Sequence, residues 1–278
     1  MEYCLGLLRK IYQKILSVLF IFTGMKPWKK GYGEFKRLSI QKMLADGAFH
    51  SEKLVSGYGF RLDERIIEYP WFFSLLPEES GKILDAGSIL NYEYLLNNPV
   101  LGNKKIYIST LAPESVCFAN KGISYVYEDL RDSCFKDDCF DWIVSLSTIE
   151  HIGLDNTMLY TFDATKNESK TSTHILAIKE FYRMLKPGGK LFLSFPFGIH
   201  KDHGWFQVFN SKMLDEVISE FSPSFSKEYH FRYAPEGWLV SSRDESKDAT
   251  CFDIHTQKNY DADLAAFSRA VVCLELVK

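Results

Sequence analysis

Three histidines of this 278-residue chain stand where a proton could be moved during a reaction. His151 follows an apolar run, whereas His200 and His203 follow a second run that ends near Phe197. Imidazole has a pKa near neutrality, so it can take the proton of a hydroxyl group that becomes a nucleophile. His151 is therefore the first candidate for a general base, and His200 and His203 are the others. For each of them the competing interpretation is a histidine that only hydrogen-bonds a neighbouring loop.

The loop that contains His200, Asp202 and His203 has the composition of a metal site. Three residues in one loop do not make a site, and no Cys/His array at zinc spacing accompanies them. We therefore predict no metal. The six cysteines lack a Cys-x-x-Cys pair, which predicts free thiols in a reducing compartment, with a bond or metal shared by Cys134 and Cys139 as the alternative.

A short apolar run, 82–84, leads into Asp85, Ala86, Gly87 and Ser88. This pattern predicts a buried parallel strand and a tight turn, because glycine lets the backbone turn sharply and approach a ligand. Ligands of open α/β sheets bind beyond the carboxyl ends of the strands. These four residues are therefore predicted to border a binding crevice.

From Gly81 onward, predicted strands and helices alternate, which indicates an α/β fold with a largely parallel sheet and helices on both faces. A helix is expected over about 172–185, and Pro187-Gly188-Gly189 ends it. The strands are expected near 82–86, 105–109, 124–127, 142–146, 190–195, 227–233 and 270–276.

Three segments carry a family resemblance: 82–88, 137–145 and 181–194, the last with its Pro-Gly-Gly turn. Together with the Glu150-His151 pair they resemble class I S-adenosylmethionine (SAM) dependent methyltransferases over about 81–197. The chain is similar overall to methyltransferases of bacterial polysaccharide and glycan gene clusters. The resemblance implies SAM as cofactor and a Rossmann-like seven-stranded sheet, mostly parallel with an antiparallel last strand.

The resemblance also implies roles for single residues. Asp85 would orient the amino-acid part of SAM, and Gly87, in the turn that also holds Ala86 and Ser88, would admit the sugar. Asp129 would receive the adenine amino group while Leu130 packs on the ring, unless Asp129 only caps a turn. Ser147 would lie at the methyl-donor end of the site.

Two departures from the family pattern stand out. Ile89 and Asn91 occupy positions where further glycines are usual, and the second strand ends without the acidic residue that bridges the ribose hydroxyls. Thr110 is our candidate for that contact, with Ser109 or Glu114 as alternatives. The departures leave open a SAM-fold protein that has lost catalysis and acts as a binding or assembly subunit.

The N-terminus predicts an amphipathic helix over about 3–22, with basic residues Lys26, Lys29 and Lys30 just beyond it. Its all-apolar run 18–22 is far shorter than the roughly 20 residues of a spanning helix. Peripheral contact with an anionic membrane and docking on protein are both open.

Two regions are expected. Residues 1–80 form an N-terminal helical segment that caps the active site, and 81–278 form the methyltransferase domain. A polar stretch at about 153–173 is expected to be a lid-like insertion, or else a tolerated surface loop.

The net charge of −3 gives no overall basic field, so nucleic acid is not expected as a partner. The lack of a glycine-rich dinucleotide motif argues against a nicotinamide dehydrogenase. We expect a SAM-dependent methyltransferase of a bacterial-type cytoplasm, in part membrane-associated, that acts on a hydroxyl of a sugar, glycan precursor or other small metabolite. An N- or lipid methyltransferase is the alternative among enzymes.

Overall fold

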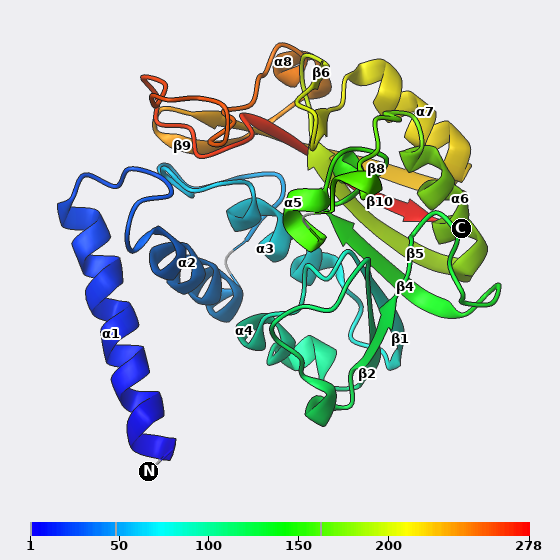
Figure 1. Ribbon diagram of the computed structural model, residues 1–278, viewed down its shortest axis with the longest axis horizontal. Helices are drawn as coiled ribbons and strands as arrows, with labels where there is room; N and C mark the ends of the chain where they lie inside the picture. Colours follow the sequence, from blue (N-terminus) through cyan, green and yellow to red (C-terminus); the bar gives the residue numbers. More distant parts are fainter. Residues whose placement is uncertain (1, 48, 162) are drawn as a thin grey trace.

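An eight-stranded sheet forms the centre of the computed structural model, which describes residues 2–47, 49–161 and 163–278 (Figure 1). The strand order is β3-β2-β1-β4-β5-β10-β8-β9. The strands are β1 Gly81–Ala86, β2 Lys104–Thr110, β3 Ser124–Tyr127, β4 Phe140–Leu146, β5 Leu185–Pro196, β8 Phe225–Ala234, β9 Gly237–Ser241 and β10 Ala270–Val277. A separate hairpin joins β6 Lys201–Asp202 and β7 Gln207–Val208.

The expected Rossmann-like arrangement is confirmed. Strands β1 to β5 pair in parallel, and β10 lies between β5 and β8 and runs against both. The expected number of seven strands is wrong by one, because β9 adds an eighth strand through a hairpin with β8. The hairpin turns at Gly237, which has a φ of +128° and lies so close to the Tyr58 backbone that a Cβ would meet its oxygen at 2.5 Å.

Helices cover both faces of the sheet, because successive side chains of its central strands point into two different cores. Ile83 and Val144 join the core under α3 Arg65–Leu75, whereas their neighbours Leu84 and Ile143 join the core under α6 His174–Met184 and α7 Ser211–Phe221. Strands buried on both sides read as continuous apolar runs, which is why these were visible in the sequence.

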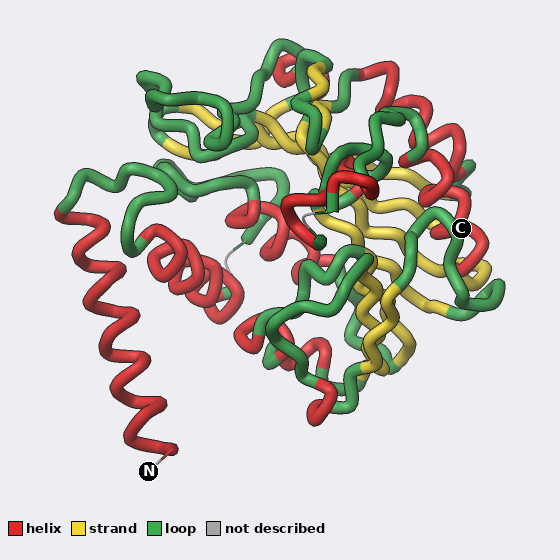
Figure 2. The backbone as a smooth tube through the Cα atoms, viewed as in Figure 1, coloured by secondary structure: helices red, strands yellow, loops and turns green. Residues whose placement is uncertain are grey.

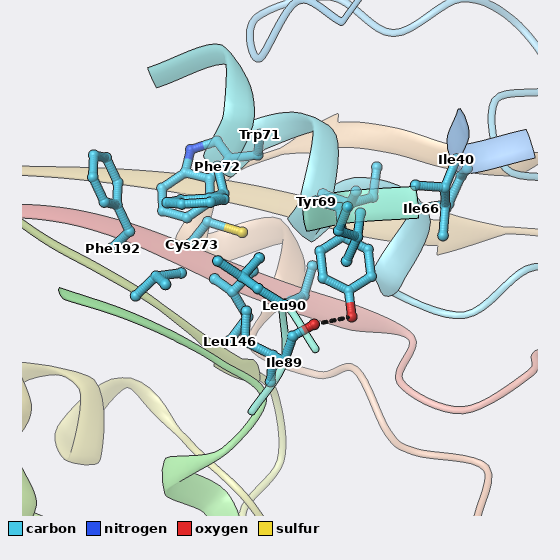
Figure 3. Close-up of a cluster of buried hydrophobic side chains, with 14 of the residues drawn as sticks. Ile40, Ile66, Tyr69, Trp71, Phe72, Ile89, Leu90, Leu146, Phe192 and Cys273 are labelled. Atoms are coloured by element: carbon cyan, nitrogen blue, oxygen red, sulfur yellow. Dashed lines mark hydrogen bonds between the residues drawn. The ribbon is translucent and has the colours of Figure 1, made fainter. Parts of the chain in front are cut away.

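Aromatic side chains hold α3 on its face of the sheet. The rings of Trp71 and Phe72 lie edge-on to Phe192 of β5, with centroids 6.0 and 5.3 Å away (Figure 3). On the same helix the Tyr69 hydroxyl donates a 2.8 Å hydrogen bond to the Ile89 carbonyl. The N-terminal region is therefore fixed to the turn that follows β1.

Shorter elements complete the chain. They are α4 Glu93–Leu96, η1 Pro99–Leu101, η2 Ala119–Lys121, η3 Ile149–His151, α5 Thr157–Tyr160, η4 Ala164–Lys166 and α8 Arg243–Ser246. Helix α1, Glu2–Phe22, covers the span expected for the amphipathic helix and packs on α2, Tyr32–Asp46. Within the described ranges, no helix has both the length and the apolar character needed to cross a membrane.

The polar stretch expected at about 153–173 contains α5 and η4, and lies at the end of the sheet where the loops after β1, β2 and β4 gather (Figure 2). Its two ends are tied together, because the Lys170 amide donates a 2.7 Å hydrogen bond to the Gly153 carbonyl. A Cβ at Gly153 would meet the Thr173 hydroxyl at 2.0 Å. The base of the insertion is therefore closely packed.

Candidate functional site

A cavity of about 670 Å³ lies beyond the carboxyl ends of β1 to β4. The loops after these strands form its walls, and Asn156, Leu159, Tyr160 and Glu168 of the insertion line it as well. A second hollow of about 500 Å³ shares Arg65, Gly87 and Tyr160 with it. The two form one crevice at the position expected for the ligand of an open α/β sheet.

The turn after β1 is built around Asp85, whose carboxylate is fully buried. Oδ1 accepts a 3.0 Å hydrogen bond from the Ile89 amide, and Oδ2 accepts a 2.8 Å bond from the Leu90 amide. Burial raises the pKa of Asp85 to about 7, although these two bonds act against the shift. Asp85 is not among the residues that line the cavity, so its carboxylate shapes the turn.

The remaining residues of this turn differ in their access to the crevice. Ala86 is buried in the core, Gly87 lines both hollows, and Ser88 lines the second. Gly87 has a φ of +120°, and a Cβ there would meet the Thr148 hydroxyl at 2.3 Å, so only glycine fits. The hydroxyl of Ser88 is buried without a hydrogen-bond partner.

The end of β2 presents the hydroxyl of Thr110, the residue that the sequence predicted for the ribose contact. Thr110 lines the cavity, and its buried Oγ1 has no hydrogen-bond partner. Glu114 lines the second hollow and accepts a 2.9 Å hydrogen bond from Asn91. The third candidate, Ser109, donates its hydroxyl to Glu128 at 3.0 Å and does not line the crevice.

The loop after β3 brings Asp129 and Leu130 to the cavity wall. Arg131 binds both carboxylate oxygens of Asp129, with Nε 2.9 Å from Oδ1 and Nη2 2.6 Å from Oδ2. Burial would raise the pKa of Asp129, but the hydrogen bonds from Arg131 hold it below its usual value. Arg131 also pairs with Glu168 at 2.6 Å and so joins this loop to the insertion.

A buried glutamate of α3 fixes the turn after β4 through hydrogen bonds. Ser147 lines the cavity and donates its hydroxyl to Glu68 Oε1 at 2.5 Å, and Ser194 of β5 donates to the same oxygen at 2.6 Å. The other oxygen of Glu68 pairs with Arg65 at 2.9 Å. Arg65 in turn donates a 2.9 Å bond to the Leu146 carbonyl.

Sequence reasoning missed Arg65, although it lines both hollows. The available signal was a run of charged residues, Asp63, Glu64, Arg65 and Glu68, at the start of an otherwise apolar helix. Charges are rarely buried in such a helix unless they are paired.

His151 lines the cavity with one nitrogen already engaged. Its Nδ1 lies 2.8 Å from the Trp205 carbonyl, which can only accept, so Nδ1 carries the proton and Nε2 carries the lone pair. Burial lowers the pKa of His151 to about 4. The neighbouring Glu150 is buried, and burial raises its pKa well above the usual value. The imidazole is therefore neutral near pH 7.

His200 and His203 lie apart from the cavity, around the β6–β7 hairpin. The Nδ1–H of His200 donates to the Val208 carbonyl at 2.9 Å. The His203 ring stacks on Phe206 with centroids 4.3 Å apart, and its Nδ1 lies 3.4 Å from Asp253. Neither histidine lines the crevice, and no cluster of metal-ligating side chains occurs among the residues that the structure describes.

Residues 87–193 match a family model described as "Methyltransferase domain". No curated protein matches the chain. Similar solved structures include a putative methyltransferase from Bacillus halodurans, 12% identical, with a TM-score of 0.49 over 76% of this chain and 99% of the other. Another is a SAM-dependent methyltransferase from Methanosarcina mazei, 15% identical, with a TM-score of 0.44 over 75% of this chain and 97% of the other. Residues 87–193 are thus similar to a methyltransferase domain.

The crevice suits SAM in size and chemistry. Small-ligand sites measure roughly 300–1,000 Å³, and the cavity of about 670 Å³ falls within that range. The unpartnered Thr110 hydroxyl can bind a sugar hydroxyl, Leu130 offers an apolar wall, and Arg65 offers a cation for a carboxylate. The residues present therefore fit the cofactor.

Proposed function

We propose that this chain transfers the methyl group of SAM to a hydroxyl of a small acceptor, with His151 as the general base. The observation that supports this proposal is the hydrogen bond from His151 Nδ1 to the Trp205 carbonyl, which leaves Nε2 as a proton acceptor. Sugars and glycan precursors, the acceptor class expected from the sequence, are the first to test.

The cofactor contacts that we propose follow the strand ends. Arg65 holds the carboxylate of SAM, because it is the cation shared by both hollows. Thr110, with Glu114 nearby, binds the ribose, and Asp129 and Leu130 hold the adenine. Arg131 already contacts both oxygens of Asp129 through its backbone amide, Nε and Nη2, so the adenine amino group would share one of these oxygens with Arg131. Asp85 shapes the turn after β1 and makes no direct contact with SAM.

The chemistry that we assign to the protein is positioning and proton transfer. When bound, SAM supplies an electrophilic methyl group. His151 Nε2 would take the proton of the acceptor hydroxyl as its oxygen receives the methyl group, and the methyl–sulfur bond would break to leave neutral S-adenosylhomocysteine. The insertion lines the same cavity. Burial lowers the pKa of His151 to about 4, so the imidazole is unprotonated at neutral pH and Nε2 keeps its lone pair.

The experiment is a methyl-transfer assay with isotopically labelled SAM and a panel of sugar nucleotides, oligosaccharides, amines and lipids. Labelled O-methyl product formed by the wild type and by His203→Ala, but not by His151→Ala, supports the proposal. Label found only on nitrogen overturns the hydroxyl assignment. If calorimetry detects SAM binding but no acceptor is methylated, the protein is a binding subunit.

A further inference from the structure

Helix α1 exposes a row of large apolar side chains on the side away from α2. They include Ile11, Ile15, Val18, Leu19 and Phe22, with Ile15 at 52% and Phe22 at 82% of full exposure. Spacings of three and four residues place them on one face of the helix. Such a continuous apolar face marks an interaction site.

The opposite face of α1 already has its partner. Leu16 and Phe20 are buried, and the Phe20 ring lies edge-on to Tyr32 of α2 with centroids 5.7 Å apart. Gln13 accepts a 2.6 Å hydrogen bond from Arg37 of α2. These contacts fix the rotation of α1, so its outer row cannot turn inward without breaking them. In Figure 1 the helix lies at the edge of the molecule.

Charge distinguishes this region from the rest of the chain. Between residues 3 and 33 there are six basic residues and no acidic one, whereas the whole chain has a net charge of −3. Lys14 of α1 and Lys26, Lys29 and Lys30 beyond it are exposed. Trp28, 41% exposed, lies within the same basic segment.

We propose that the outer face of α1 docks on the surface of a bilayer that contains anionic lipid. Apolar side chains enter the boundary between headgroups and acyl chains, and lysines beside them pair with the anionic headgroups. A helix with one apolar face lies along the surface. This docking does not rest on the proposed methyl acceptor.

The charge pattern favours lipid over a second copy of the chain. A symmetric dimer through this face would bring two strongly basic segments together, and like charges oppose such contact. An anionic bilayer neutralises the same lysines. The segment therefore matches a surface of opposite charge that also has an apolar interior.

The test is flotation of the full chain, without SAM, with phosphatidylcholine vesicles and with vesicles that also contain phosphatidylglycerol. We expect binding to the anionic vesicles, weakened by salt. The double variant Ile15→Glu/Leu19→Glu and the charge variant Lys14→Glu/Lys30→Glu should each reduce binding about tenfold or more. Leu176→Glu on α6 is the matched control, because Leu176 is also an exposed leucine of a helix, and it should bind like the wild type.

Several results would overturn the proposal. They are equal binding to neutral and anionic vesicles, no binding to either, and binding that neither α1 variant changes. Light scattering decides the remaining case: a stable dimer that Ile15→Glu/Leu19→Glu dissociates, without vesicle binding by the wild type, assigns the face to a second copy. Circular dichroism checks that each variant keeps its helix content. Because the assay needs no turnover, its failure leaves the proposed function untouched.

Discussion

The turns after β1 and β4 use their polar residues in different ways. In the first, both oxygens of Asp85 accept backbone amides, and Asp85 does not line the crevice. In the second, His151 lines the cavity, gives one nitrogen to the Trp205 carbonyl and keeps the other. A polar side chain at a strand end can act on a ligand only where the fold leaves it facing the crevice.

The largest expected effect is on turnover. Removing the imidazole in His151→Ala should lower kcat by about a thousandfold, within the range of general bases, while SAM affinity changes little. Steady-state kinetics with labelled SAM, together with calorimetry, measures both quantities. His203→Ala is the matched control, because it removes a histidine outside the crevice, and its kcat should stay near that of the wild type. Equal losses of kcat in the two variants would contradict the role of His151 as the general base.

The next effect is on stability, at the residue that links α3 to the β4 turn. Arg65→Met leaves the carboxylate of Glu68 buried without its cation, which should lower the free energy of unfolding by about 3 kcal/mol. Urea unfolding measures this, and calorimetry should also show weaker SAM binding.

Arg243→Met is the control for Arg65→Met, because Arg243 pairs with Glu228 and Asp215 on the surface. It should cost about 1 kcal/mol or less. If Arg65→Met were no more harmful than this surface variant, the buried link between the two regions would be unimportant.

A smaller effect concerns pH and Asp85. Its folded pKa of about 7 lies above the unfolded value, so its stabilising contribution is complete below about pH 4 and is lost as the pH rises through 7. Between pH 5 and 8 the loss should be roughly 3 kcal/mol. Urea unfolding of the wild type and of Asp85→Asn at both values isolates this term, since the variant lacks the ionisable group. If the free energy of unfolding changed with pH in the same way in both proteins, Asp85 would not be the source of the pH dependence.

The sheet was readable from the sequence for a physical reason. Strands buried on both faces appear as apolar runs, and the strand expected near 142–146 lies within β4, which is buried almost throughout. Strand β9 was not expected from the sequence, and it pairs with β8 at the edge of the sheet. Apolar runs therefore located the central strands, whereas β9 depends on its pairing with β8.

The site was readable only in part. Gly87, Thr110, Asp129 and His151, which motif position singled out, all line the cavity. Motif position could not show that the Asp85 carboxylate accepts hydrogen bonds from backbone amides of the turn that follows it. It also could not reveal Arg65, which lies before the domain in sequence and reaches the β4 turn only through the packing of α3.

The smallest effect tests the contact between the insertion and the rest of the cavity. Glu168→Gln removes the charge that Arg131 meets while Asp129 stays paired, so the insertion should open more easily. A partly exposed pair contributes about 0.2–1 kcal/mol, so stopped-flow release of SAM should accelerate by about two- to fivefold. Asp137→Asn breaks a similar pair with Arg183, which has no part in lining the cavity, and should leave release unchanged. Equal release rates in both variants would mean that the insertion does not hold the donor in place.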